Sequence, residues 1–124
     1  TETQGSIVSP AIRNGISALR PTFGRTSRHG GMVLAWSQDR VGPMCRTVED
    51  CAMVFNAYHG GDEKDPSTVT TPFQFDRNLK LATLRIGVDT QAPKELVDKL
   101  RELGMTPKEV GPRPTVPGVG GGGL

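Results

Sequence analysis

The stretch LATLRIGVDTQAPKELVDKLRELG, residues 81–104, decides the fold class. Residues 81–89 alternate in the manner of a β-strand. Residues 93–104 carry apolar side chains at helical spacing, with a proline at the start and a glycine at the end. A strand followed by such a helix is half of an α/β crossover. We therefore predict an α/β fold.

A second helix is predicted upstream, from Val48 to Tyr58. Thr47 is a good N-cap residue, and two acidic residues follow in the first turn, where the helix dipole favours negative charge. Gly60 and Gly61 supply a C-terminal stop. Apolar side chains recur at three- and four-residue spacing, so one face of this helix is expected to pack into a core.

The remaining segments are short elements and loops. Residues 6–13 indicate a short helix interrupted by Pro10 near its start, and residues 16–19 indicate a short strand. Residues 61–80 are polar and contain two prolines, which is typical of a long surface loop. We expect residues 1–110 to form a partial domain and residues 111–124 to be a Gly/Pro-rich tail or linker.

Length, charge and composition limit which partners and which location are expected for this chain. The chain has 124 residues, enough for about one domain, and its net charge of +2 is spread without long runs of one sign. No nucleic-acid or membrane partner is therefore expected. There is no signal-peptide pattern and no membrane-spanning run, which favours a cytoplasmic protein. Cys45 and Cys51 have no histidine at zinc-ligand spacing, so we expect two reduced structural thiols rather than a zinc site.

The first ten residues, TETQGSIVSP, raise the question of catalysis. A serine hydroxyl becomes a useful nucleophile only with a base to take its proton and donors for the oxyanion. A glycine at position 5 allows a tight turn before Ser6, and successive backbone amides at Thr3, Gln4, Gly5 and Ser6 can point at one spot. The alternative is that Thr3 or Ser6 simply caps the following helix.

A longer pattern resembles the amidase signature family, serine hydrolases that include fatty acid amide hydrolase and the A subunit of tRNA-dependent amidotransferase. The family pattern reads Asp-Thr-Gly-Gly-Ser-Ile-Arg-x-Pro, then Gly-Leu-Lys-Pro-Thr-x-Gly-Arg, Asp-x-x-Gly-Pro and Thr-Val-Glu-Asp. Its counterparts here are Glu2 to Ser6 with Ile7 and Pro10, Ala18 to Arg25, Asp39 with Gly42 and Pro43, and Thr47 to Asp50. The resemblance covers residues 1–68 in order and spacing.

The resemblance implies that Ser6 is the acylated nucleophile and that the backbone amides of Thr3, Gln4, Gly5 and Ser6 line an oxyanion hole. The substrate class it implies is a small-molecule amide, hydrolysed at its C–N bond. Two positions depart from the pattern. Gln4 replaces a glycine, which removes a glycine-only backbone angle, and Val8 replaces an arginine beside the site.

The family also uses a lysine and a second serine in cis geometry, both upstream of the nucleophile. The first lysine of this chain is Lys64. We therefore expect a fragment of the family's α/β fold, which is a mixed sheet flanked by helices, incomplete at both ends and inactive alone. His29 and His59 are candidate bases of the chain itself, and both are more typical of solvated or capping histidines.

Asp39 is interpreted as a turn-former, and Arg20 and Arg25 as surface or loop-anchoring arginines. Two alternatives to a general amidase stay open. One is a piece of the A subunit of a tRNA-dependent amidotransferase. The other is a non-catalytic fragment that associates through apolar surface, including homo-oligomers formed at exposed sheet edges.

Overall fold

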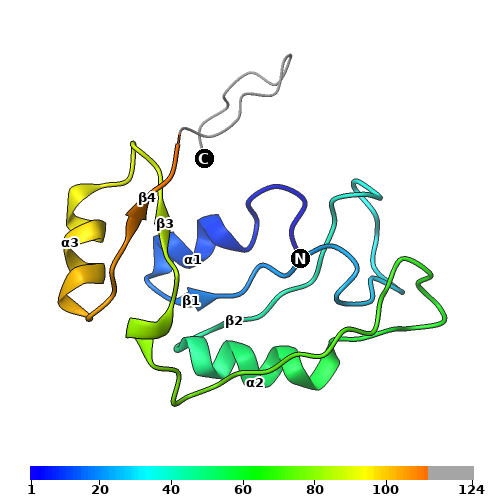
Figure 1. Ribbon diagram of the computed structural model, residues 1–124. Helices are drawn as coiled ribbons and strands as arrows, with labels where there is room; N and C mark the ends of the chain where they lie inside the picture. Colours follow the sequence, from blue (N-terminus) through cyan, green and yellow to red (C-terminus); the bar gives the residue numbers. More distant parts are fainter. Residues whose placement is uncertain (112–124) are drawn as a thin grey trace. The chain divides into compact units, whose positions relative to one another are not determined.

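A computed structural model describes residues 1–111 of the chain (Figure 1). The predicted tail at 111–124 therefore lies outside the described residues, except for its first residue. The chain divides into two compact units, Thr1–Arg77 and Asn78–Leu124. Within residues 1–111, no helix combines the length and apolarity that crossing a membrane requires.

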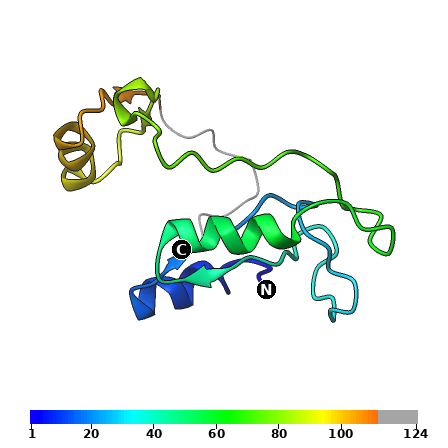
Figure 2. The same ribbon diagram turned by 90° about the horizontal axis from the view of Figure 1, so that it is seen from below.

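The first unit packs two helices on a pair of short strands. Its elements are α1 (Val8–Asn14), β1 (Ser17–Ala18), β2 (Met44–Cys45) and α2 (Val48–Tyr58). The strands pair antiparallel, with Ser17 opposite Cys45 and Ala18 opposite Met44. Figure 1 shows the strand pair between α1 and α2, and Figure 2 shows β2 running alongside α2. The buried apolar residues of this unit are Ile7, Ala11, Cys51, Ala52 and Phe55.

Helix α2 has the predicted bounds, and its ends follow the predicted chemistry. The Thr47 hydroxyl accepts the Asp50 amide at 3.0 Å, and the Asp50 carboxylate accepts the Thr47 amide at 3.2 Å. This reciprocal capping box satisfies two amides at the start of the helix. The helix ends at Tyr58, and two residues later Gly60 has a φ of 125°, a backbone conformation that residues other than glycine rarely adopt.

Helix α1 starts two residues later than the predicted range of 6–13. Pro10 does not interrupt it, because the first turn of a helix has no intrahelical partner for a backbone N–H at that position. Gly15 ends the helix in the left-handed region, with a φ of 61°. The strand predicted over 16–19 is present as the shorter β1.

Residues 61–80 contain no helix or regular strand, as predicted for a loop. The loop nevertheless contacts the rest of the first unit at several points, including an ion pair and a ring contact. Asp65 is buried and pairs with Arg28 at 3.2 Å, and the Phe73 ring lies 4.9 Å from that of Phe55 in an edge-to-face contact. These contacts attach a polar segment to the first unit without regular secondary structure.

The second unit is a small crossover. A 3₁₀ turn (Leu81–Thr83) precedes β3 (Gly87–Val88), α3 (Lys94–Glu102) and β4 (Lys108–Glu109), and β3 pairs parallel with β4. This arrangement confirms the α/β crossover and adds a strand that the sequence does not predict. The strand predicted over 81–89 is wrong in its first half. There the Thr83 amide and hydroxyl both donate to the Lys80 carbonyl, at 2.9 and 2.7 Å, and close a turn instead.

Candidate active site

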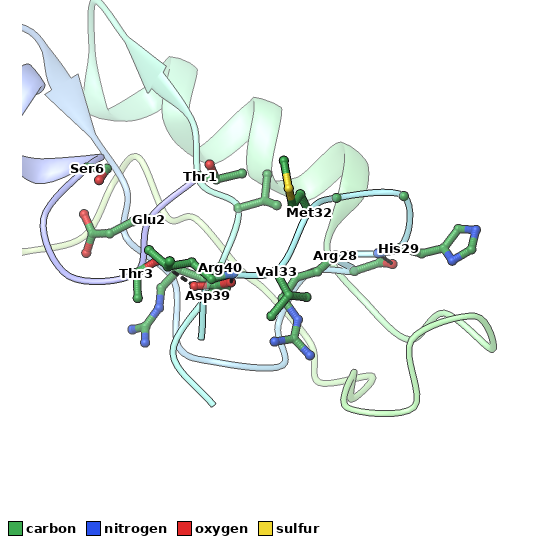
Figure 3. A pocket seen from close by; sticks show the side chains of 15 residues that line it. Thr1, Glu2, Thr3, Ser6, Arg28, His29, Met32, Val33, Asp39 and Arg40 are labelled. Atoms are coloured by element: carbon green, nitrogen blue, oxygen red, sulfur yellow. Dashed lines mark hydrogen bonds between the residues drawn. The ribbon is translucent and has the colours of Figure 1, made fainter. Parts of the chain in front are cut away.

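A cleft of about 500 Å³ opens in the first unit beside the segment that contains Ser6. Residues 1–3 and 6, 27–34 and 39–41 line it. Figure 3 shows Ser6 at one end of the cleft and His29 at the other, with Asp39 and Thr3 between them. The cleft therefore joins the segment of the predicted nucleophile to residues 27–41, which are more than 20 positions further along the chain.

Ser6 lies in the turn immediately before α1, and its side chain is exposed. Within the part of the chain that the structure describes, its hydroxyl has no hydrogen-bond partner. The capping alternative is wrong, because Ile7 occupies the N-cap position of α1 without a side-chain cap. Thr3 does not cap the helix either, since its hydroxyl donates to Asp39 instead. The Ser6 hydroxyl is therefore free for another partner.

The start of α1 is capped by Glu2. One oxygen of this buried carboxylate accepts the amides of Ile7 and Val8, at 2.8 and 3.1 Å, and the other pairs with Arg20. Burial raises the pKa of Glu2, but the two amides and the guanidinium outweigh it, so the pKa lies below its ordinary value. In the family pattern an aspartate stands at the position of Glu2, and the resemblance implies no capping role for that residue. The signal in the sequence is an acid four residues before the serine.

The amides before α1 contrast with those that Glu2 occupies. The backbone groups of Glu2 and Arg40 exchange two hydrogen bonds, of 2.8 and 2.9 Å. Among residues 1–111, no acceptor takes a hydrogen bond from the amides of Thr3, Gln4, Gly5 or Ser6. Four successive N–H donors therefore remain unoccupied directly before the exposed hydroxyl.

Neither Gln4 nor Gly5 adopts a conformation reserved for glycine. No residue other than glycine has a positive φ in the described chain, and Gly5 is not among the glycines that do. A Cβ built on Gly5 has no other atom within 4 Å. The chain bends at residues 3–5 without a glycine-only backbone angle, so the turn before Ser6 does not depend on Gly5, and the replacement of a family glycine by Gln4 causes no backbone strain.

Val8 stands where the family pattern has an arginine, and its side chain carries no charge. The guanidinium that forms an ion pair with Glu2 belongs to Arg20. Arg20 is thus more than a surface arginine, because its partner is fully buried. Arg25 anchors a loop as expected: its guanidinium donates to the Thr71 carbonyl at 3.0 Å and lies over the Phe55 ring.

Asp39 forms a turn, as interpreted, and reaches further. One oxygen accepts the amides of Leu34 and Ala35, at 2.7 and 3.0 Å, and the other accepts the Thr3 hydroxyl at 2.6 Å. The Thr3 hydroxyl first, and then the Leu34 amide, lower the pKa of Asp39 below its ordinary value. The residue connects the wall of the cleft to the segment before Ser6.

The two histidines do not meet Ser6. Figure 3 shows the His29 ring directed away from Ser6. His59 lies outside the cleft lining and stacks on Phe55, with ring centroids 5.3 Å apart. Neither is placed to take the proton of Ser6.

Cys45 and Cys51 are free thiols. Burial is the main reason that the pKa of Cys51 is raised, which keeps this thiol protonated and unreactive. Over residues 1–111, no group of three or more His, Cys, Asp or Glu side chains is arranged to hold a metal ion.

Comparisons with known proteins give a consistent family. The family described as Amidase matches residues 1–113. Two curated relatives are named as the A subunit of glutamyl-tRNA(Gln) amidotransferase. The one from Thioalkalivibrio sulfidiphilus is 38% identical over 90% of this chain, and the one from Pseudomonas entomophila is 44% identical over 77%. The chain spans only 26% and 20% of these two relatives.

Solved structures agree. An amidase family protein from Bacillus anthracis has a TM-score of 0.70 and 36% identity over 86% of this chain. The A subunit of glutamyl-tRNA(Gln) amidotransferase from Thermotoga maritima has a TM-score of 0.62 and 26% identity over 77%. This chain covers 24% of each. The extent of the family match and these likenesses place the chain in a known family: it belongs to the amidase family.

Proposed function

We propose that this chain carries the nucleophile segment of a serine amidase, with Ser6 as the residue that is acylated. The observation that carries the proposal is the exposed Ser6 hydroxyl, directly preceded by four unoccupied amides at the edge of a cleft. Glu2 occupies the next two amides, of Ile7 and Val8. The free donors are thereby limited to the positions that the family uses.

The chemistry follows from these groups. The Ser6 Oγ attacks the carbon of a small-molecule carboxamide, and the carbonyl oxygen becomes an oxyanion. The backbone amides of Thr3, Gln4, Gly5 and Ser6 donate to that oxyanion and stabilise it. The C–N bond then breaks, the amine leaves with a proton, and water releases the acid from the serine ester.

The proton of Ser6 needs an acceptor that residues 1–111 do not place beside it. The family's lysine and second serine supply that acceptor elsewhere in the parent protein. We therefore expect this chain alone to be inactive, because a serine without its base keeps only a small advantage over water.

The test is a chimera of the Bacillus anthracis amidase family protein in which this chain replaces the matching quarter. A fluorophosphonate probe should label the chimera, and Ser6→Ala should abolish the label. Ser9→Ala is the matched control, since Ser9 is an exposed serine one turn further on, and it should leave labelling unchanged. A folded chimera without label, or a label that survives Ser6→Ala, would contradict the proposal.

A second candidate is a piece of an amidotransferase A subunit, favoured by the identity of 38% and 44% to two relatives with that name. The departures at Gln4 and Val8 favour a general amidase. Transfer of amide nitrogen to glutamyl-tRNA(Gln) by the parent protein, rather than simple amide hydrolysis, would decide for the second candidate.

The remaining expectations stay predictions. They are a cytoplasmic location, no direct binding of nucleic acid or membrane, and no cofactor. Homo-oligomers formed at sheet edges are also a prediction, consistent with two sheets of only two strands each in the described residues. Sedimentation of the purified chain tests the last of these.

A further inference from the structure

The unoccupied amides before Ser6 belong to four peptide planes, and hydrogen bonds to the carbonyl groups fix the orientation of only two of these planes. A trans peptide is planar, so a hydrogen bond to its carbonyl also fixes the direction of its N–H. The Glu2 carbonyl accepts from Arg40 at 2.9 Å, which orients the Thr3 amide away from Arg40. The Gly5 carbonyl accepts from the Ser9 amide at 2.8 Å, which orients the Ser6 amide in the same way.

The two middle planes have no such bond. In the described part of the chain, the carbonyls of Thr3 and Gln4 accept no hydrogen bond, so backbone contacts leave the amides of Gln4 and Gly5 unfixed. The group that holds this stretch is the Thr3 side chain, whose hydroxyl donates to Asp39 at 2.6 Å (Figure 3). Fixing this side chain restricts the Thr3 backbone, and with it the peptide that follows.

We propose that Asp39 is a positioning residue that, through the Thr3 hydroxyl, holds the amides of Gln4 and Gly5 in one orientation. The proposal rests on the proposed role of these amides as oxyanion donors. The second oxygen of Asp39 accepts the amide of Leu34, which lines the cleft, and that of the next residue, Ala35. The wall and the donor segment are therefore held by one carboxylate. Reduced motion of the donors lowers the cost of arranging them when an oxyanion forms.

The competing role is local: Asp39 closes its own turn, and the bond to Thr3 has no effect on the donors. The two roles predict different results for two side chains. Loss of the Thr3 hydroxyl should loosen residues 4–5 and leave residues 34–35 rigid. Loss of the Asp39 carboxylate should loosen both.

The test uses the full chain labelled with ¹⁵N, and measures backbone order parameters by NMR relaxation in wild type, Thr3→Val, Thr3→Ser and Asp39→Ala. We expect order parameters of about 0.85 at Gln4 and Gly5 in wild type, falling below about 0.6 in Thr3→Val and Asp39→Ala. Thr3→Ser keeps the hydroxyl and should restore the wild-type value. The amides of Leu34 and Ala35 should loosen only in Asp39→Ala.

Unchanged order parameters at Gln4 and Gly5 in folded Thr3→Val would overturn the proposal. Equal loosening in Thr3→Ser and Thr3→Val would also overturn it, because the hydroxyl would then have no role. If Asp39→Ala does not fold, the two Thr3 variants decide alone. These readouts need no catalysis, so failure of the labelling experiment would refute the proposed function without deciding this point.

Discussion

The carboxylate of Glu2 brings together residues that are far apart in sequence. It accepts hydrogen bonds from the amides at the start of α1 and forms an ion pair with Arg20. The backbone of the same residue pairs with that of Arg40. We expect Glu2→Gln to lower the free energy of unfolding by about 2–3 kcal/mol, because it leaves a guanidinium without its buried partner and weakens two hydrogen bonds. Chemical denaturation monitored by circular dichroism measures this change.

Glu49→Gln is the matched control for that prediction. Glu49 also pairs with an arginine, Arg77, but its side chain is 36% exposed and that of Arg77 is 74% exposed. Exposed pairs contribute little, so we expect a change below about 0.5 kcal/mol. Equal effects of the two substitutions would show that burial of Glu2 is not what makes its pair important.

The buried pair of Asp65 and Arg28 predicts loss of stability in acid. The Arg28 guanidinium, followed by the Ser67 hydroxyl, lowers the pKa of Asp65 well below 3.8. A lowered folded-state pKa stabilises the fold above the unfolded value, and this contribution is lost as the pH falls through the folded value. The free energy of unfolding should therefore fall progressively as the pH drops below about 5. Asp65→Asn should show a smaller fall, and an equal fall would contradict the assignment.

At the scale of elements, α2 supplies the main apolar contact of the first unit. Phe55 is 3% exposed and touches the rings of Tyr58, His59 and Phe73. We expect Phe55→Ala to lower the free energy of unfolding by about 3–5 kcal/mol. Met53 lies on the same helix and is 66% exposed, so Met53→Ala should change it by less than about 0.5 kcal/mol. Thermal and denaturant unfolding of both variants test whether the buried face of α2 carries this stability.

The elements that the sequence predicts well are those with local signals. Helix α2 has a capping box and an acidic start, α3 follows a proline and has an acidic residue in its first turn, and both have apolar spacing within their own residues. Strands β1, β2 and β4 are two residues long, and only their pairing partners define them. The partner of Ser17 is Cys45, and that of Gly87 is Lys108, so no local pattern reveals them.

The residues of the candidate site fall into the same two groups, those that a local motif predicts and those whose role depends on contacts between distant segments. A motif of adjacent residues predicts Ser6 and the amides before it. No local motif predicts the roles of Glu2 and Asp39, because they depend on Arg20, on Thr3 and on the loop at 34–35, which only folding brings into contact. Gly5 shows the limit of a local rule, since the chain bends at residues 3–5 without using the positive φ that only glycine readily adopts.

At the scale of the whole chain, each compact unit contains at least one buried apolar side chain. Phe55 is buried in the first unit, and Met105, which is 7% exposed, is buried in the second. We therefore expect the units to open separately. In Met105→Ala, hydrogen exchange should become faster at the amides of Lys108 and Val110, which bond to the carbonyls of Ile86 and Val88.

The reciprocal substitution completes this prediction. In Phe55→Ala, exchange should become faster at α2 amides such as that of His59, which bonds to the carbonyl of residue 55 at 2.9 Å. The amides of Lys108 and Val110 should then keep their wild-type rates. Faster exchange across both units in either variant would show one cooperative fold instead. Separate opening would mean that the second unit can be lost while the cleft beside Ser6 stays formed, because every residue that lines that cleft lies between positions 1 and 41.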